Sequence, residues 1–150
     1  MNTIDKVRLF HQTFEHPVAT ALTTGDFALR QLSVKLIAEE LGEFARACGV
    51  TLLLSVDPRK GEETDYLEVL DRPEVKPDII EMADALGDLD YVVAGANLVF
   101  GIPAVAVLDE IQSSNMSKAG ADGRPVKRED GKILKGPNYF KPNIAKVLGL

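Results

Sequence analysis

Two long segments of this chain combine a helical pattern of apolar residues with a row of carboxylates, and this combination restricts the fold more than any other feature. The acids are Glu39, Glu40 and Glu43 in the first segment, residues 27–48, and Glu81, Asp84 and Asp88 in the second, residues 78–100. With about 100° of rotation per residue, each set lies on one face of its helix. Like charges three and four residues apart repel, so neither helix is stabilised locally by its acids. Two such helices that face each other need cations between them.

Apolar residues also repeat every three or four positions in two other segments. This spacing predicts helices over residues 4–15 and from 103 to about 118. Residues 91–108 carry no charge and reach the lower length limit of a membrane-spanning helix. However, Gly101-Ile102-Pro103 interrupts this run with residues that end one helix and begin another. We therefore expect two buried helix segments there and no membrane span.

The connecting stretches have a different composition. Residues 50–56 are apolar and short, and their pattern does not distinguish a helix from a strand. Residues 57–77 are charged and proline-containing, so we expect an irregular excursion with one short helix near residues 62–70. In the last part of the chain, Asp130-Gly131 predicts the turn of a small β-hairpin over residues 126–134.

The sequence thus predicts a single all-α domain. Its four-helix core would span residues 1–118, and a basic, loop-rich C-terminal extension would span residues 119–150. The chain has a net charge of −6. Residues 118–150 hold eight Lys or Arg and three Asp or Glu, a balance of +5, which leaves −11 for residues 1–117.

An acidic body argues against binding to duplex nucleic acid, which requires a basic face. It allows a small polyanionic ligand if metal ions or the basic extension neutralise the charge. The single cysteine, Cys48, excludes a disulfide framework and a thiolate zinc site. The N-terminal residues lack the basic and apolar pattern of a secretion signal, so we expect a cytoplasmic protein.

The acidic faces are candidate metal ligands, because hard divalent cations such as Mg²⁺ and Mn²⁺ prefer carboxylate oxygens. The structural alternative is that they are ordinary solvated helix faces. Glu81 has a further alternative, since Asp78 and Glu81 have the spacing of a capping box at a helix N-terminus. Glycine in a helix interior costs about 1 kcal/mol relative to alanine. Gly42 and Gly87 inside the acidic motifs therefore suggest that another group approaches closely. The chain has no Glu-x-x-His pair, which argues against a ferritin-like di-iron site.

The ordered set of motifs resembles the all-α nucleoside triphosphate pyrophosphohydrolases, a group that includes MazG-like enzymes, dimeric dUTPases and phosphoribosyl-ATP pyrophosphohydrolase. The resemblance begins with Glu39-Glu40-x-x-Glu43 and Glu81-x-x-Asp84-Ala85-Leu86-Gly87-Asp88. It continues with Asp109-Glu110-Ile111-x-x-Ser114-Asn115-Met116-Ser117-Lys118 and Gly131-Lys132-x-Leu134-Lys135-Gly136, which resemble the MazG-like branch. These motifs extend over more than half of the chain.

The resemblance implies a MazG-type helical core that assembles as a homodimer or homotetramer and binds Mg²⁺, with Mn²⁺ as a substitute. It implies hydrolysis of a nucleoside triphosphate, with a dNTP favoured, between the α and β phosphates. The products are the monophosphate and pyrophosphate, and the role by analogy is the removal of surplus or non-standard nucleotides. One alternative is the same cleavage of phosphoribosyl-ATP in histidine synthesis. An alternative of another class is a non-catalytic, metal-binding helical assembly protein.

The resemblance also assigns roles by position. Glu40, Glu43, Asp84 and Asp88 would hold the metal, with Glu81 as a further ligand, and Glu39 would act as the base or orient the water. Asn115 and Lys118 would reach the phosphates. The chemistry of the leaving pyrophosphate adds the bases of the extension as candidates, with an ordinary solvated hairpin as the structural alternative. These bases are Lys127, Arg128, Lys132 and Lys135.

Two departures from the family pattern stand out. The spacing from Glu43 to Glu81 is longer than usual, so residues 50–77 resemble an insertion. The second motif can be aligned on Asp88 or on Glu81 and Asp84, and which of these three acids bind metal directly stays open.

Overall fold

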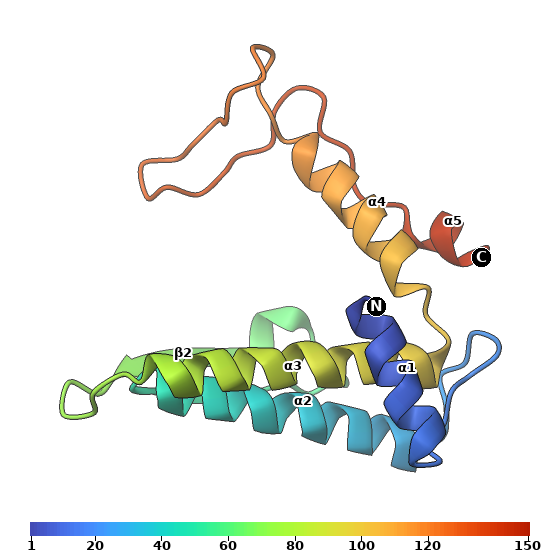
Figure 1. The fold of residues 1–150 in the computed structure, drawn as a ribbon. Coiled ribbons are helices and arrows are strands. Elements are labelled where there is room, and N and C mark those ends of the chain that lie inside the picture. Colours follow the sequence, from blue (N-terminus) through green and yellow to red (C-terminus); the bar gives the residue numbers. More distant parts are fainter. The chain divides into compact units, whose positions relative to one another are not determined.

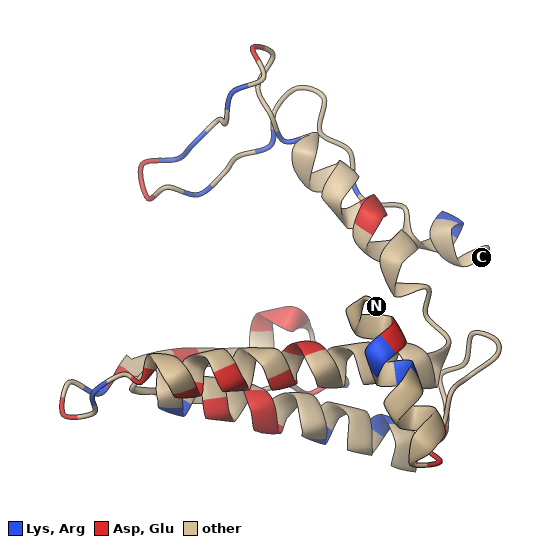
Figure 2. Cartoon of the chain, in the orientation of Figure 1, with Lys and Arg blue, Asp and Glu red and all other residues tan.

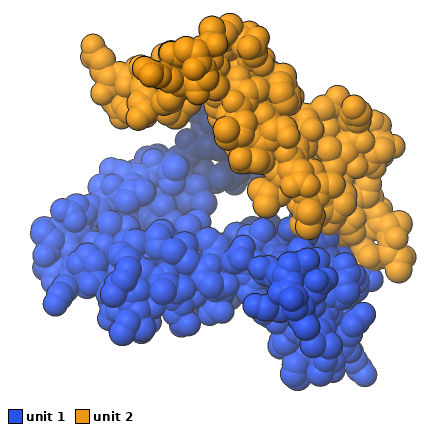
Figure 3. All heavy atoms as spheres, turned by 45° about the horizontal axis from the view of Figure 1, so that its top comes forward, with its two compact units in different colours: residues 1–18, 24–99 blue, residues 19–23, 100–150 orange.

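The computed structural model describes all residues from Met1 to Leu150, and the chain is mostly helical (Figure 1). The helices are α1 (Thr3–Thr13), α2 (Phe27–Ala47), α3 (Ile79–Phe100), α4 (Ala104–Met116) and α5 (Ile144–Leu148). The strands are β1 (Val50–Ser55) and β2 (Tyr66–Asp71), with one 3₁₀ turn, η1 (Glu62–Thr64), between them. The chain divides into two compact units, one of residues 1–18 and 24–99 and one of residues 19–23 and 100–150 (Figure 3).

The two long helices of the first unit, α2 and α3, lie side by side and run in opposite directions (Figure 1). Side-chain caps define where each begins. Asp26 Oδ1 accepts a hydrogen bond from the backbone N–H of Leu29 at 2.8 Å, and Asp78 Oδ1 accepts one from Ile80 at 2.9 Å. The backbone N–H of Asp78 donates to the carbonyl of Ala47 at 2.9 Å, so the end of α2 is bonded to the start of α3. Both predicted long helices are confirmed.

A two-stranded antiparallel hairpin connects α2 to α3. Val50 of β1 lies opposite Asp71 of β2, and Ser55 lies opposite Tyr66. The apolar run that could be a helix or a strand is therefore a strand. The short helix predicted near residues 62–70 is wrong, since only η1 is helical and the chain then enters β2. Pairing with β1, a partner distant in sequence, outweighs the local preference of these residues.

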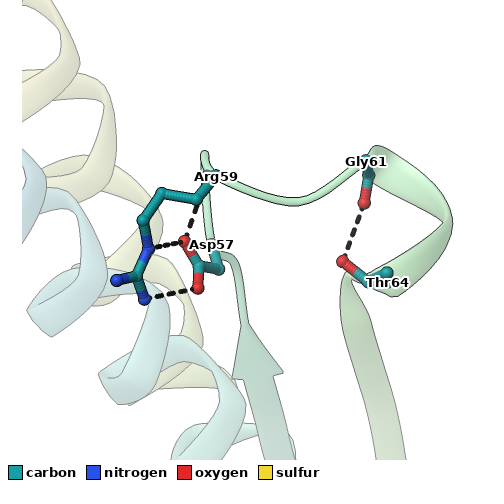
Figure 4. A network of polar contacts seen from close by, with 4 residues as sticks. All are labelled: Asp57, Arg59, Gly61 and Thr64. Carbon is teal, nitrogen blue, oxygen red and sulfur yellow. Dashed lines mark hydrogen bonds and ion pairs between the residues drawn. The ribbon is translucent and has the colours of Figure 1, made fainter.

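Short-range polar contacts shape the tip of the hairpin (Figure 4). Arg59 donates through Nε and Nη2 to the two carboxylate oxygens of Asp57, at 2.9 and 2.7 Å. These hydrogen bonds lower the pKa of the Asp57 carboxyl. Thr64 Oγ1 donates to the carbonyl of Gly61 at 2.8 Å and closes the 3₁₀ turn. Both contacts are exposed, so they order the tip and add little to stability.

α1 packs on α3 through a small apolar cluster. Val7 is fully buried and forms this cluster with Ala94 and Leu98. The closest approach is at Gly95, where an added Cβ atom would lie 3.2 Å from Nε2 of His11. The His11 ring is itself buried, and its Nδ1 lies 2.9 Å from the carbonyl oxygen of Pro17. The ring therefore has little freedom to move away from α3.

In the second unit the C-terminal extension folds back onto α4. Ser114 Oγ donates to the carbonyl of Phe140 at 2.8 Å, and Glu110 Oε1 accepts from the backbone N–H of Asn143 at 2.7 Å. The predicted hairpin around Asp130-Gly131 is present as a turn with a single β-bridge between Lys127 and Ile133. The sequence predicts no element for the last apolar stretch, where α5 forms.

A four-helix bundle is not confirmed. α1, α2 and nearly all of α3 belong to the first unit, α4 belongs to the second, and a two-stranded sheet occupies the connection between α2 and α3. The predicted break at Gly101-Ile102-Pro103 does separate α3 from α4. No single helix is both long and apolar enough to cross a membrane, and only α3 and α4 taken together across this break meet that length and composition.

Two glycines of α3 form a matched pair for a test of this packing. We expect Gly87→Ala to raise the free energy of unfolding by up to about 1 kcal/mol, because no atom lies within 4 Å of the added Cβ and alanine favours the helix. Gly95→Ala should instead lower it by about 1 kcal/mol, since the methyl group presses on the buried His11 ring. Urea denaturation measures both effects. The m-value should stay that of the wild type, so that the shift in midpoint reports stability alone. Equal effects of the two substitutions would contradict the packing of α1 on α3.

Candidate active site

The six predicted acids all lie in the first unit, three on α2 and three on α3 (Figure 2). Because the helices are antiparallel and bonded where Ala47 meets Asp78, residues equally far from this joint lie at the same level. By this measure Glu43 lies level with residues 81–84, and Glu40 lies level with residues 84–88. The order of the acids along each helix therefore brings the two rows to the same place.

Glu40 lies at the centre of the acidic cluster. Its carboxylate oxygen Oε2 is buried and has no hydrogen-bond partner. Burial raises the pKa of the Glu40 carboxyl, and repulsion by Glu43, Asp88, Glu39 and Asp84 raises it further. Acids from both helices therefore lie near enough to Glu40 to act on its carboxyl.

A cavity of about 430 Å³ opens beside these acids, at the joint of α2 and α3. Its charged lining consists of the acids Glu43, Asp78, Glu81 and Asp84 and the bases Arg46 and Lys76. The volume falls within the usual range of small-molecule sites. The site therefore combines an acidic wall from both helices with two cations at one end.

The capping alternative for Glu81 is not what the structure shows. Asp78 caps α3, and its Oδ1 also accepts from the backbone N–H of Glu81 at 3.3 Å. In a capping box, the Glu81 carboxylate would accept in return from the N–H of Asp78. That N–H donates to Ala47 instead. The Glu81 side chain lines the cavity and is available to a ligand.

The close approach predicted at Gly42 and Gly87 is not found within this chain. An added Cβ at Gly42 would meet only the guanidinium of Arg46, at an ordinary distance of 3.5 Å. At Gly87 it would meet nothing within 4 Å, because this part of α3 is exposed. The glycine of α3 that does pack closely against another group is Gly95. Nothing in the sequence distinguishes it except its apolar neighbours.

The donor set suits a hard divalent cation by its chemistry, although it does not form a finished coordination shell. All six side chains offer carboxylate oxygens, which Mg²⁺ prefers. The unpartnered Oε2 of Glu40 lacks the neutralising contact that a cation would supply. No three Asp, Glu, His or Cys side chains lie close enough together to hold a metal ion. To share a cation, these side chains would have to rotate toward one another.

The predicted phosphate-binding residues all lie in the second unit. Lys118 Nζ donates to Asn115 Oδ1 at 2.8 Å, so these two groups meet at the end of α4. Lys132 is exposed beside the Asp130-Gly131 turn. Lys135 Nζ lies 4.7 Å from the ring centre of Tyr139, in a cation–π contact.

The two bases of the cavity, Arg46 and Lys76, are not among the residues predicted from the sequence. Arg46 follows Glu43 by three positions on α2, so helical spacing is sufficient to identify it as a neighbour of the acids. Lys76 lies between β2 and α3, and its position depends on where the hairpin returns. No local sequence pattern predicts that position.

Glu40→Gln removes the charge at the centre of the cluster while keeping its shape. We expect this variant to unfold at a higher temperature than the wild type near neutral pH in the presence of a chelator. The pKa of Glu40 is raised in the folded state, so ionisation penalises the folded protein as the pH rises through that raised pKa. In acid both states are protonated and the penalty is absent, so the difference in Tm should shrink as the pH is lowered. A pH-independent gain, or an equal gain in the exposed control Glu63→Gln, would contradict this.

A family model described as phosphoribosyl-ATP pyrophosphohydrolase matches residues 7–115 of the chain. This range includes α2, α3 and all six acids. No curated protein matches the sequence. The matched range covers well over half of the residues. The chain therefore belongs to the phosphoribosyl-ATP pyrophosphohydrolase family, a MazG-like family of hydrolases that act on acid anhydrides.

Proposed function

We propose that this protein hydrolyses the anhydride bond between the α and β phosphates of a nucleotide's triphosphate chain and releases pyrophosphate. One observation carries the proposal: burial of the Glu40 carboxylate, together with repulsion by acids from two antiparallel helices, raises the pKa of Glu40. Such a concentration of negative charge is unfavourable unless a cation and its ligand complete it. The family match supports the same chemistry.

Phosphoribosyl-ATP is the compound that the family's description names, and we propose it as the first candidate substrate. This reverses the preference for a dNTP that the motifs favoured. A nucleoside triphosphate is the second candidate, supported by the MazG-like motifs of residues 109–118 and 131–136, of which the second lies beyond the matched range. Both compounds carry the same triphosphate chain, so the same carboxylates serve either one.

The proposed metal ligands are Glu40, Glu43, Glu81, Asp84 and Asp88. Mg²⁺, or Mn²⁺ in its place, supplies charge neutralisation and Lewis acidity at the phosphate chain when it is bound. Glu39, exposed on α2 next to the cluster, is proposed to accept the proton of the attacking water. The water oxygen bonds to phosphorus, and the bridging P–O bond breaks with its electron pair leaving on pyrophosphate.

Asn115, Lys118, Lys132 and Lys135 are proposed to bind phosphate oxygens. Their support is the net positive charge of residues 118–150 and the family resemblance of the motifs that contain them. Cationic donors form charge-assisted hydrogen bonds to phosphate and stabilise charge that develops on the leaving group.

The enzyme is proposed to act as a homodimer or a homotetramer. Large apolar side chains are exposed along α2, among them Leu32 at 50% and Val34 at 67% of their accessible surface. Extended apolar surface of this kind is typical of an interface between subunits.

The activity is tested by incubating the protein and Mg²⁺ with phosphoribosyl-ATP, ATP and each dNTP, and assaying pyrophosphate. We expect pyrophosphate from at least one of these compounds, and loss of at least about 100-fold in rate with Asp84→Asn, because a metal ligand is lost. The matched control is Asp90→Asn on the same helix, whose carboxylate accepts from Thr3 Oγ1 of α1. It should retain activity.

Two outcomes would contradict the proposed activity. Orthophosphate as the first product would indicate cleavage of a different bond. No turnover of any nucleotide, with Mg²⁺ still raising Tm, would favour the non-catalytic, metal-binding assembly protein.

The oligomer is tested by light scattering after size-exclusion chromatography. We expect a mass of at least twice the 16.3 kDa of the chain, and a shift toward monomer with Val34→Lys. Lysine is a good helix former, so α2 itself should be retained. Leu67→Lys in β2, at a position of similar exposure (68%), is the control. A wild type that is monomeric at all concentrations would contradict the assembly.

A further inference from the structure

Two basic side chains line the cavity at the joint of α2 and α3. Neither the acidic motifs nor the family resemblance gives them a role. Arg46 comes from the last turn of α2, and Lys76 comes from the short segment after β2. They line the same cavity as Glu43, Glu81 and Asp84. The proposed metal ligands and two bases therefore share one pocket within the first unit.

The backbone around Lys76 is held on both sides. On one side, an added Cβ at Gly49 would lie 2.8 Å from the carbonyl oxygen of Val75, so these two backbones are in contact. Gly49 also has a φ of +69°, which a residue with a side chain rarely adopts. On the other side, the N–H of Asp78 is bonded to Ala47. Pro77 further restricts Lys76 to an extended conformation. The backbone of Lys76 is thus held beside the cavity on both sides.

Neither cation is committed to a strong partner. Lys76 forms no ion pair or side-chain hydrogen bond. Arg46 Nη2 lies 3.7 Å from Glu43 Oε1, and both side chains are more than half exposed. An exposed pair at this distance contributes little to stability. Both cations can therefore turn to an anion in the cavity without loss of a structural contact.

We propose that Lys76 and Arg46 bind the terminal phosphates of the substrate and hold the departing pyrophosphate. This inference rests on the proposed function and extends it to the residues that bind the β and γ phosphates of the triphosphate chain. The acids of the cavity repel phosphate, whereas these two bases attract it. The opposite charges orient the chain, with its terminal phosphates toward the base of the hairpin. A nucleoside monophosphate lacks those phosphates and does not engage the two bases.

Isothermal titration of pyrophosphate into the full-length protein, at saturating Mg²⁺, tests the proposal without turnover. We expect Lys76→Ala and Arg46→Ala each to weaken binding about tenfold, as expected for the loss of one charge-assisted hydrogen bond. Lys76→Arg should retain most of the affinity. Lys60→Ala removes the same charge from the tip of the same hairpin and should have no effect. In the active enzyme, product inhibition by pyrophosphate should weaken in Lys76→Ala, while inhibition by the nucleoside monophosphate should not change.

The outcomes separate this inference from the proposed function. Wild-type pyrophosphate binding in both alanine variants of an active enzyme would overturn the inference and leave the activity standing. An effect of Arg46→Ala alone would also overturn it, because loss of the contact with Glu43 would then explain the result. Equal weakening of inhibition by both products would show that the bases do not distinguish the terminal phosphates, which overturns it as well. A protein that releases no pyrophosphate from any nucleotide would refute the proposed function, and the titration would still report on the two bases.

Discussion

The mutual repulsion of carboxylates between α2 and α3 is the constraint on which the rest of this structure depends. The hydrogen bond from the backbone N–H of Asp78 to the carbonyl of Ala47 joins the end of α2 to the start of α3. The acids of one helix therefore cannot slide away from those of the other. The effect is seen at Glu40, whose Oε2 atom is buried without a hydrogen-bond partner and whose carboxyl has a raised pKa. This arrangement lowers the free energy of unfolding in the absence of a ligand. The proposed cation would recover that free energy when bound, which would couple its binding to stability.

The features that could be predicted from sequence are those with local causes. Both long helices follow from apolar spacing and from Asp26 and Asp78 at their starts, where side-chain caps form. The position of each acid along its helix follows from the constant rise per residue of an α-helix. The antiparallel arrangement of α2 and α3 then brings acids equally far from the Ala47–Asp78 joint to the same height. The sequence could not decide between a capping role and a place at the cavity for Glu81, because the capping box fails only when the N–H of Asp78 bonds to Ala47, a residue far away in the sequence.

Features with non-local causes were missed. β2 forms because β1 is beside it, although the charged residues before it favour a helical turn. The close contact of Gly95 with His11 depends on how α1 crosses α3, and sequence does not report crossing positions. Gly42 and Gly87 show the converse, since a glycine in a helix signals close packing only where a neighbour is present. The same reasoning explains why Arg46 could be inferred from spacing and Lys76 could not.

The contact between Gly49 and Val75 closes the base of the β1–β2 hairpin. The intervening residues form a loop whose two ends meet before the chain continues into α3. The entropy cost of such a loop grows slowly, by roughly 0.6 kcal/mol for each doubling of its length. A change in the length of the hairpin tip therefore carries little penalty in free energy, and the acid-bearing helices keep their spacing because the loop is closed at its base.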